Sequence, residues 1–217
     1  MPLHKTINFS RSVGTTTEIL LWKITEPLSE LSAEVTLNPK NQVRFNGMKS
    51  ELHQRAFLSV RKLLQLKGYT DFDLDYDQFG KPNLKDGKHI SISHSHEYAT
   101  LIISNEIAGI DIELQREKII KIADKFVEPE WKFLDKENQE YIRKLTVIWG
   151  IKESIFKIRN EAGISFKEHI NVFPFHIEDQ SGTAILRFQN KSFQFKYHFI
   201  EIDNFTLVYA FQQKLQK

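Results

Sequence analysis

The hydrophobic positions along the chain change their spacing several times, which predicts a mixture of strands and helices. Residues 15–25 are rich in β-branched and apolar side chains, which predicts a strand. Apolar residues at helical spacing follow from about Lys49, and Gly68 is the expected end of that helix. Three strand patterns then come in quick succession, at 89–93, 99–104 and 108–114.

The second half of the chain repeats this alternation of helix and strand patterns. Helical spacing returns at 118–126 and restarts after Pro129, a residue that suits the first turn of a helix. The longest helical pattern runs from about 137 to 159 and ends before Gly163. Strand patterns rich in aromatic residues follow at 183–188, 192–202 and 205–212. Long helices set between clusters of strands predict an α+β fold.

Composition narrows the function classes. The chain has 217 residues, 41% of them hydrophobic, which is enough for a well-packed core. Its formal net charge of +2 argues against a dedicated nucleic-acid binder, although a local basic patch stays open. The absence of cysteine excludes disulfides, thiolate metal sites and cysteine nucleophiles. Because we find neither a signal-peptide pattern nor a membrane-spanning run, we expect a cytoplasmic protein without a membrane partner.

Two acids alternate with apolar residues in the strand pattern at 108–114. Ile110 and Ile112 should point to one face of the strand, and Asp111 and Glu113 to the other. Two neighbouring carboxylates repel each other unless a cation lies between them, and Mg²⁺ prefers such oxygen ligands. The alternative is an edge strand whose solvent-facing side carries two ordinary surface acids.

The long helical pattern carries three charged residues of interest. On a helical wheel, Lys152 falls inside a wide apolar arc, whereas Glu153 and Lys157 lie one turn apart at its rim. A lysine inside an apolar arc needs a path to water or a partner charge. Glu153 could add a third carboxylate to a metal site, and both lysines could meet phosphate oxygens. Alternatively, Glu153 and Lys157 form an ordinary surface pair.

Weaker candidates lie upstream. Lys81, between Gly80 and Pro82, is in an expected turn and could simply be solvated. His94 is expected near the end of a strand, where ligand contacts are often made. Arg55 and Arg61 lie on the helix that begins near Lys49, within a basic run that could include a phosphate ligand.

Four motifs in this order resemble the 4'-phosphopantetheinyl transferase superfamily, and specifically its larger Sfp-type (surfactin-synthetase-activating) branch. The resemblance covers residues 80–157. It rests on Gly80-Lys81-Pro82, Ser93-His94-Ser95, Gly109-Ile110-Asp111-Ile112-Glu113, and Trp149 followed by Lys152-Glu153-Ser154 and Lys157. Each motif is weak alone, but four in series are hard to obtain by chance.

The resemblance implies a set of site residues. Mg²⁺, or Mn²⁺ in its place, would be held by Asp111, Glu113 and Glu153. Coenzyme A would be bound by residues from both halves of the chain, namely Lys81, Pro82, Ser93, His94, Lys152, Lys157 and an arginine, with Arg55 as first choice and Arg61 as second. The catalytic residues would be Glu113, Glu153 and Lys157. The proton acceptor stays open among Glu113, Glu130, Lys157 and a water on the metal.

The resemblance also implies a fold and a reaction. Residues 1–106 and 107–217 would form two similar α+β halves about a pseudo-twofold axis, in a monomer with coenzyme A in the cleft between them. The enzyme would transfer phosphopantetheine from coenzyme A to a serine of an apo acyl or peptidyl carrier protein. Two other functions stay open: a coenzyme A-binding module without chemistry, and a different metal-dependent phosphotransferase or nuclease. The sequence does not identify the carrier.

Overall fold

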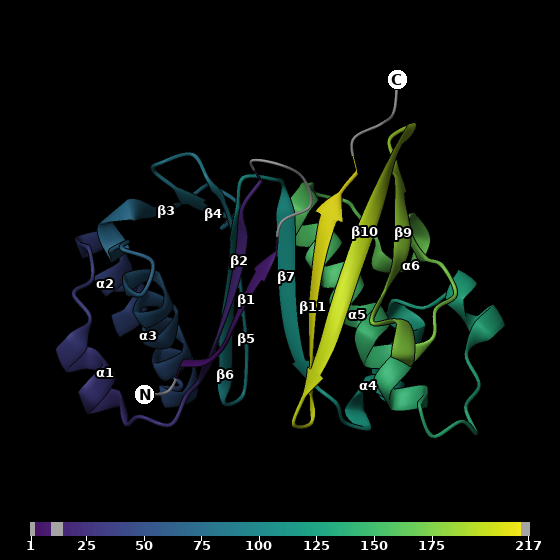
Figure 1. Cartoon of the computed structure of the whole chain (residues 1–217), viewed down its shortest axis with the longest axis horizontal. Helices are drawn as coiled ribbons and strands as arrows, with labels where there is room; N and C mark the ends of the chain where they lie inside the picture. The colour runs from purple at the N-terminus through teal and green to yellow at the C-terminus, as the bar shows by residue number, and fades with distance from the viewer. Residues whose placement is uncertain (1–2, 10–14, 214–217) are drawn as a thin grey trace. The chain divides into compact units, whose positions relative to one another are not determined.

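The computed structural model describes residues 3–9 and 15–213, and the chain divides into two compact units, 1–106 and 107–217 (Figure 1). Each unit contains an antiparallel sheet with a long helix packed on it, so the fold is α+β as expected. No helix among the described residues combines the length and the apolar character needed to cross a bilayer.

The first unit is built on a four-stranded antiparallel sheet in the order β1-β2-β6-β5. These strands are β1 (Leu3–Phe9), β2 (Thr17–Lys23), β5 (His89–Ser95) and β6 (Tyr98–Ser104). Its helices are α1 (Leu28–Glu34), α2 (Pro39–Asn46) and α3 (Glu51–Gln65), and α3 packs against β2 and β6. A 3₁₀ turn, η1 (Asp71–Asp73), leads into a hairpin of β3 (Leu74–Tyr76) and β4 (Pro82–Leu84).

Helix α3 follows the predicted hydrophobic spacing closely. Its apolar residues Phe57, Val60 and Leu64 are buried in the core of the first unit. The chain leaves the helix through Gly68, whose φ of 78° lies in the left-handed region that glycine adopts without strain. The hydrophobic pattern therefore located both the buried face of this helix and its end.

The second unit has a five-stranded antiparallel sheet in the order β7-β11-β10-β9-β8. The strands are β7 (Ala108–Leu114), β8 (Ile170–Val172), β9 (Ser181–Phe188), β10 (Lys191–Ile202) and β11 (Phe205–Gln212). The helical segments are α4 (Lys118–Ile122), η2 (Ala123–Lys125), η3 (Pro129–Phe133), α5 (Tyr141–Arg159), α6 (Phe166–His169) and η4 (Ile177–Asp179). Helix α5 packs on one face of the sheet, mainly against β7 and β11 (Figure 1).

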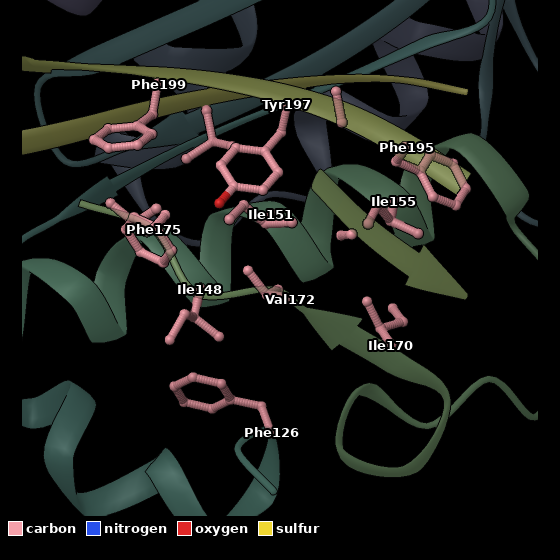
Figure 2. Close-up of a cluster of buried hydrophobic side chains, with 14 of the residues drawn as sticks. Phe126, Ile148, Ile151, Ile155, Ile170, Val172, Phe175, Phe195, Tyr197 and Phe199 are labelled. Carbon is pink, nitrogen blue, oxygen red and sulfur yellow. The ribbon is translucent and has the colours of Figure 1, made fainter. Parts of the chain in front are cut away.

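The core of the second unit fixes α5 in place. Ile148, Ile151 and Ile155 of α5 are completely buried and lie among aromatic side chains that include Phe126 and Phe195 (Figure 2). Each fully buried side chain of this size contributes about 1.5–3 kcal/mol relative to exposure. Several such contacts along one helix make its position on the sheet well determined.

Helix α5 begins later than the hydrophobic pattern predicts. The pattern suggests a start near Glu137, whereas the helix begins at Tyr141. The side chains of Asp135 and Asn138 accept hydrogen bonds from the backbone N–H groups of Glu137 and Glu140, respectively. Such local side-chain bonds compete with helical hydrogen bonding, so the preceding residues form turns instead.

Candidate active site

The two acids of β7 share one face of the strand, as the alternation predicts, but that face does not point to solvent. Strand β7 is an edge strand of its sheet, yet Asp111 is only 3% exposed and Glu113 is half-buried. Helix α5 covers this face, because the Lys157 amine lies 2.7 Å from Asp111 Oδ1. The alternative of two surface acids is therefore wrong.

Small residues let α5 approach the sheet closely. A Cβ atom on Gly109 would lie 2.1 Å from the Ser154 carbonyl oxygen, and one on Gly150 would lie 2.7 Å from Val208 Cγ2. Neither position can hold a larger residue without moving backbone or a packed β-branched side chain. These two glycines thus bring Glu153, on α5, toward the acids of β7. Gly109 belongs to one of the sequence motifs and Gly150 directly follows Trp149 of another, but the packing role of neither was recognised from the sequence.

The three carboxylates interact electrostatically. The pKa of Glu153 is raised to about 7, mainly by burial and next by the neighbouring Asp111 carboxylate, while Glu113 adds a smaller effect in the same direction. The Lys157 ammonium opposes these effects and lowers the pKa of Glu153. The structure thus brings the acids of a strand and a helix into one electrostatic neighbourhood.

Lys157 pairs with the strand rather than with its own helix. Its amine donates hydrogen bonds to Asp111 Oδ1 at 2.7 Å and to the Ile110 carbonyl oxygen at 2.9 Å. The hydrogen bonds of Lys157 therefore go to β7, and the alternative of an ordinary surface pair between Glu153 and Lys157 is wrong. The side chain keeps 25% of its surface exposed, so its positive charge stays accessible to a ligand.

The carboxylates fit a hard cation by their chemistry, but they are not arranged around one point. Among residues 3–9 and 15–213, no three His, Cys, Asp or Glu side chains converge as metal ligands. Asp111 contacts Lys157, and Glu113 Oε1 accepts a hydrogen bond of 3.3 Å from Trp149 Nε1. Burial raises the pKa of Glu153 most, and repulsion by Asp111 and Glu113 also raises it; a divalent cation would relieve that repulsion. The donor set therefore fits Mg²⁺ by its chemistry.

Lys152 has a different role from the one expected. Its side chain is completely buried, and its amine forms an ion pair of 2.8 Å with Glu130 Oε1. The same amine donates to the carbonyl oxygens of Phe126 at 2.6 Å and Phe166 at 3.1 Å, which uses its three donors. The expectation that Lys152 meets a phosphate is therefore wrong for this arrangement. Its partner Glu130 is equally buried and is not placed to accept a proton from a substrate.

The segment that carries Asp111, Glu113 and Glu153 is similar to known proteins. Residues 107–211 match the model of the 4'-phosphopantetheinyl transferase superfamily. A stretch of 117 residues is also 34% identical to the 4'-phosphopantetheinyl transferase gsp of Aneurinibacillus migulanus. That alignment covers 53% of this chain and 47% of the relative, so the chain spans about half the length of that relative. The resemblance to the superfamily and to its Sfp-type branch is confirmed.

The other candidates that the superfamily resemblance names lie in the first unit, outside the family-model match. Lys81 and Pro82 stand at the end of the turn of hairpin β3–β4, and both are half-buried. Asp77 holds this turn, because its Oδ1 accepts hydrogen bonds from the backbone N–H groups of Phe79 at 2.8 Å and Lys81 at 2.9 Å. The backbone of the superfamily motif is therefore ordered by a side chain just before it.

Ser93 and His94 lie on β5 and point to opposite faces of its sheet; Ser93 is 8% exposed, and the His94 side chain is exposed. The ring of His94 lies 5.9 Å, centroid to centroid, from the ring of His53 on α3. Sequence reasoning did not single out His53, because nothing in its local pattern distinguishes it from a surface histidine. Its proximity to His94 depends on how α3 packs on the sheet.

The two candidate arginines of α3 differ in their surroundings. Arg55 is half-buried and donates from Nη2 to the Ile24 carbonyl oxygen at 3.1 Å. Arg61 is only 2% exposed and its Nε lies 2.9 Å from Asp71 Oδ1. A phosphate cannot reach Arg61 in this position, so the second choice for a phosphate ligand is wrong and Arg55 remains.

Proposed function

We propose that this chain transfers the 4'-phosphopantetheine group of coenzyme A to a serine of an apo acyl or peptidyl carrier protein, with Mg²⁺ as cofactor. The observation that carries the proposal is the cluster of Asp111, Glu113 and Glu153 beside Lys157, within the segment that matches the superfamily. A binding module without chemistry would have no need to assemble three mutually repelling acids next to a lysine.

In the proposed reaction, the serine oxygen forms a bond to the phosphorus attached to pantetheine. The bond from that phosphorus to the bridging pyrophosphate oxygen breaks, and adenosine 3',5'-bisphosphate leaves with the bonding electron pair. Asp111, Glu113 and Glu153 would hold Mg²⁺, which when bound neutralises charge on the pyrophosphate. The Lys157 ammonium, partly exposed, would stabilise negative charge on the phosphate oxygens.

A group of the protein must also take the proton of the serine hydroxyl. Glu130 is removed from the candidates, because it is buried in its ion pair with Lys152. Lys157 is engaged as a donor to Asp111 and to the Ile110 carbonyl oxygen. We therefore favour the half-buried Glu113 carboxylate, which has acceptor capacity beside its bond from Trp149.

For the nucleotide end of coenzyme A, we propose Lys81 with Pro82, Ser93, His94 and Arg55 as binding residues. These assignments rest on the superfamily resemblance. The exposure of His94 and the ordered turn before Lys81 support them.

The test is direct. The purified chain is mixed with Mg²⁺, coenzyme A and a panel of apo acyl and peptidyl carrier proteins, and each carrier is analysed by intact-mass spectrometry. We expect the phosphopantetheine mass on at least one carrier, with equimolar adenosine 3',5'-bisphosphate. Tight coenzyme A binding by calorimetry without any transfer would favour a binding module. Release of adenosine bisphosphate without a carrier would favour a different phosphotransferase or nuclease.

A further inference from the structure

A buried ion pair joins α3 to the segment directly before hairpin β3–β4. Arg61 and Asp71 are 2% and 3% exposed, and Arg61 Nε lies 2.9 Å from Asp71 Oδ1. Nothing in the proposed reaction uses these charges. A buried pair of this kind is often no more stabilising than apolar residues of the same size, so its presence points to a role in fixing geometry.

Asp71 collects donors from two helices. Besides Arg61, its Oδ1 accepts from Asn41 Nδ2 at 2.9 Å, and its Oδ2 accepts from the Asn38 backbone N–H at 2.8 Å. Its own carbonyl oxygen accepts from Asn38 Nδ2 at 2.9 Å. Asn38 is also the N-cap of α2, where its side chain accepts from the Asn41 N–H. Asp71, the first residue of the 3₁₀ turn that leads into β3, is thus tied to the start of α2 and to the middle of α3.

The same arginine reaches the hairpin at a second point. Arg61 lies over the ring of Phe57 at 3.4 Å, and its Nη2 donates a long hydrogen bond of 3.4 Å to the Tyr76 hydroxyl. The guanidinium of Arg44 lies over the ring of Tyr76, 4.7 Å from its centroid. Tyr76 is the last residue of β3 and is paired with Pro82 of β4. The hairpin is therefore held where it begins and again next to its turn.

The turn itself is rigid. The Asp77 N–H donates to the Lys81 carbonyl oxygen at 3.0 Å, and the Gly80 N–H donates to the Asp77 carbonyl oxygen at 3.0 Å. With the two bonds to Asp77 Oδ1, the backbone from Asp77 to Lys81 has little freedom. Because the turn is rigid and the hairpin is fixed, the position of Lys81 depends on the position of Asp71.

We propose that the network of Arg61, Asp71 and Asn41, which we call the brace, is a positioning device that sets hairpin β3–β4 and hence Lys81 for coenzyme A. This inference rests on the proposed function for its catalytic readout. The brace touches no substrate. It acts by keeping the hairpin in one place before coenzyme A binds, which spares the cost of ordering it on binding.

The experiment uses the full chain and two brace variants. Asp71→Asn removes the charge partner of Arg61. Asn41→Ala removes one donor to Asp71 without leaving a buried charge unpaired. The control is Leu31→Ala, a completely buried residue of α1 in the same unit, whose truncation destabilises by packing loss alone. Two quantities are measured: the KM for coenzyme A against kcat, and amide hydrogen exchange in peptides covering residues 74–85.

We expect both brace variants to raise the KM for coenzyme A about five- to tenfold, while kcat at saturating coenzyme A changes less than about twofold. Exchange at 74–85 should accelerate about tenfold in the brace variants and not in Leu31→Ala. If Asp71→Asn does not fold, Asn41→Ala decides the question. Unchanged exchange and KM in Asn41→Ala, or equal changes in Leu31→Ala, would overturn the brace. If the wild-type chain transfers nothing, the proposed function is overturned instead. Amide hydrogen exchange at residues 74–85 then tests by itself whether the brace holds the hairpin.

Discussion

The buried ion pair of Lys152 and Glu130 offers the sharpest prediction of stability. We consider Lys152→Met, Glu130→Met and the double variant. Methionine preserves most of the volume of each side chain and removes its charge. The two side chains are completely buried and 2.8 Å apart, so each single variant leaves one charge without its counter-charge in the core.

The magnitude follows from the contacts that remain. In Lys152→Met, the Glu130 carboxylate keeps backbone donors from Val172 at 2.9 Å and Glu128 at 3.2 Å, but it loses its cation. Breaking a buried pair in this way costs about 3–5 kcal/mol. For a chain of this size that corresponds to a fall in Tm of about 6–20 °C. Burial already lowers the pKa of Lys152, while Glu130 raises it, so losing Glu130 should lower it further.

The assay is urea unfolding of the four proteins as a double-mutant cycle. We expect the double variant to lose about 1–3 kcal/mol less than the sum of the two single variants, because neither charge is then left alone. If the losses in free energy of unfolding of the two single variants simply add up in the double variant, Lys152 and Glu130 do not stabilise each other and the ion-pair argument is refuted. A Lys152→Met protein of normal stability that no longer binds coenzyme A would restore the phosphate role that the structure argues against.

Further predictions concern the contact of α5 with the sheet and the acids beside it. Gly109→Ala should destabilise the protein strongly and reduce transfer, because the added Cβ would lie 2.1 Å from the Ser154 carbonyl oxygen. The control Gly47→Ala should be tolerated in the same urea titration, because the atom nearest to its added Cβ would lie 3.5 Å away. Because the folded-state pKa of Glu153 is raised from 4.5 to about 7, the free energy of unfolding measured without Mg²⁺ should fall as pH rises between these values. The variant Glu153→Gln or added Mg²⁺ should make this pH dependence weaker. An unchanged pH dependence in both cases would contradict the proposed carboxylate cluster. Lys157→Met should reduce kcat at least about tenfold with little change in the far-ultraviolet circular dichroism spectrum.

The sequence predicted the strands and helices that have a clear period. The alternation of Ile110 and Ile112 with Asp111 and Glu113 gave β7 its bounds and placed the two acids on one face. Shorter elements escaped, among them β8, α2 and the β3–β4 hairpin, because a strand of three residues is too short to show an alternation and the eight residues of α2 cover only about two helical turns.

The site was predicted in part, for a physical reason. Residue types and motif order indicate which acids gather, but partners far apart in sequence depend on packing. The helical wheel showed that Lys152 needs a path to water or a partner charge, yet Glu130 lies 22 positions upstream and no local pattern links them. In the same way, the burial of Arg61 depends on Asp71, which belongs to a different element. Buried and solvent-facing charges look alike in a sequence until their partners are known.

The measurement that tests the central claim most directly is the transfer rate of Asp111→Asn beside that of Asp124→Asn, an exposed acid in the same unit. Both variants are assayed with saturating coenzyme A, Mg²⁺ and a carrier that the wild-type chain modifies. We predict that Asp111→Asn loses at least about 100-fold in rate while remaining folded, because the metal and Lys157 both lose a charged partner. Asp124→Asn should transfer at the wild-type rate. A folded Asp111→Asn protein with the wild-type rate would contradict the proposed active site.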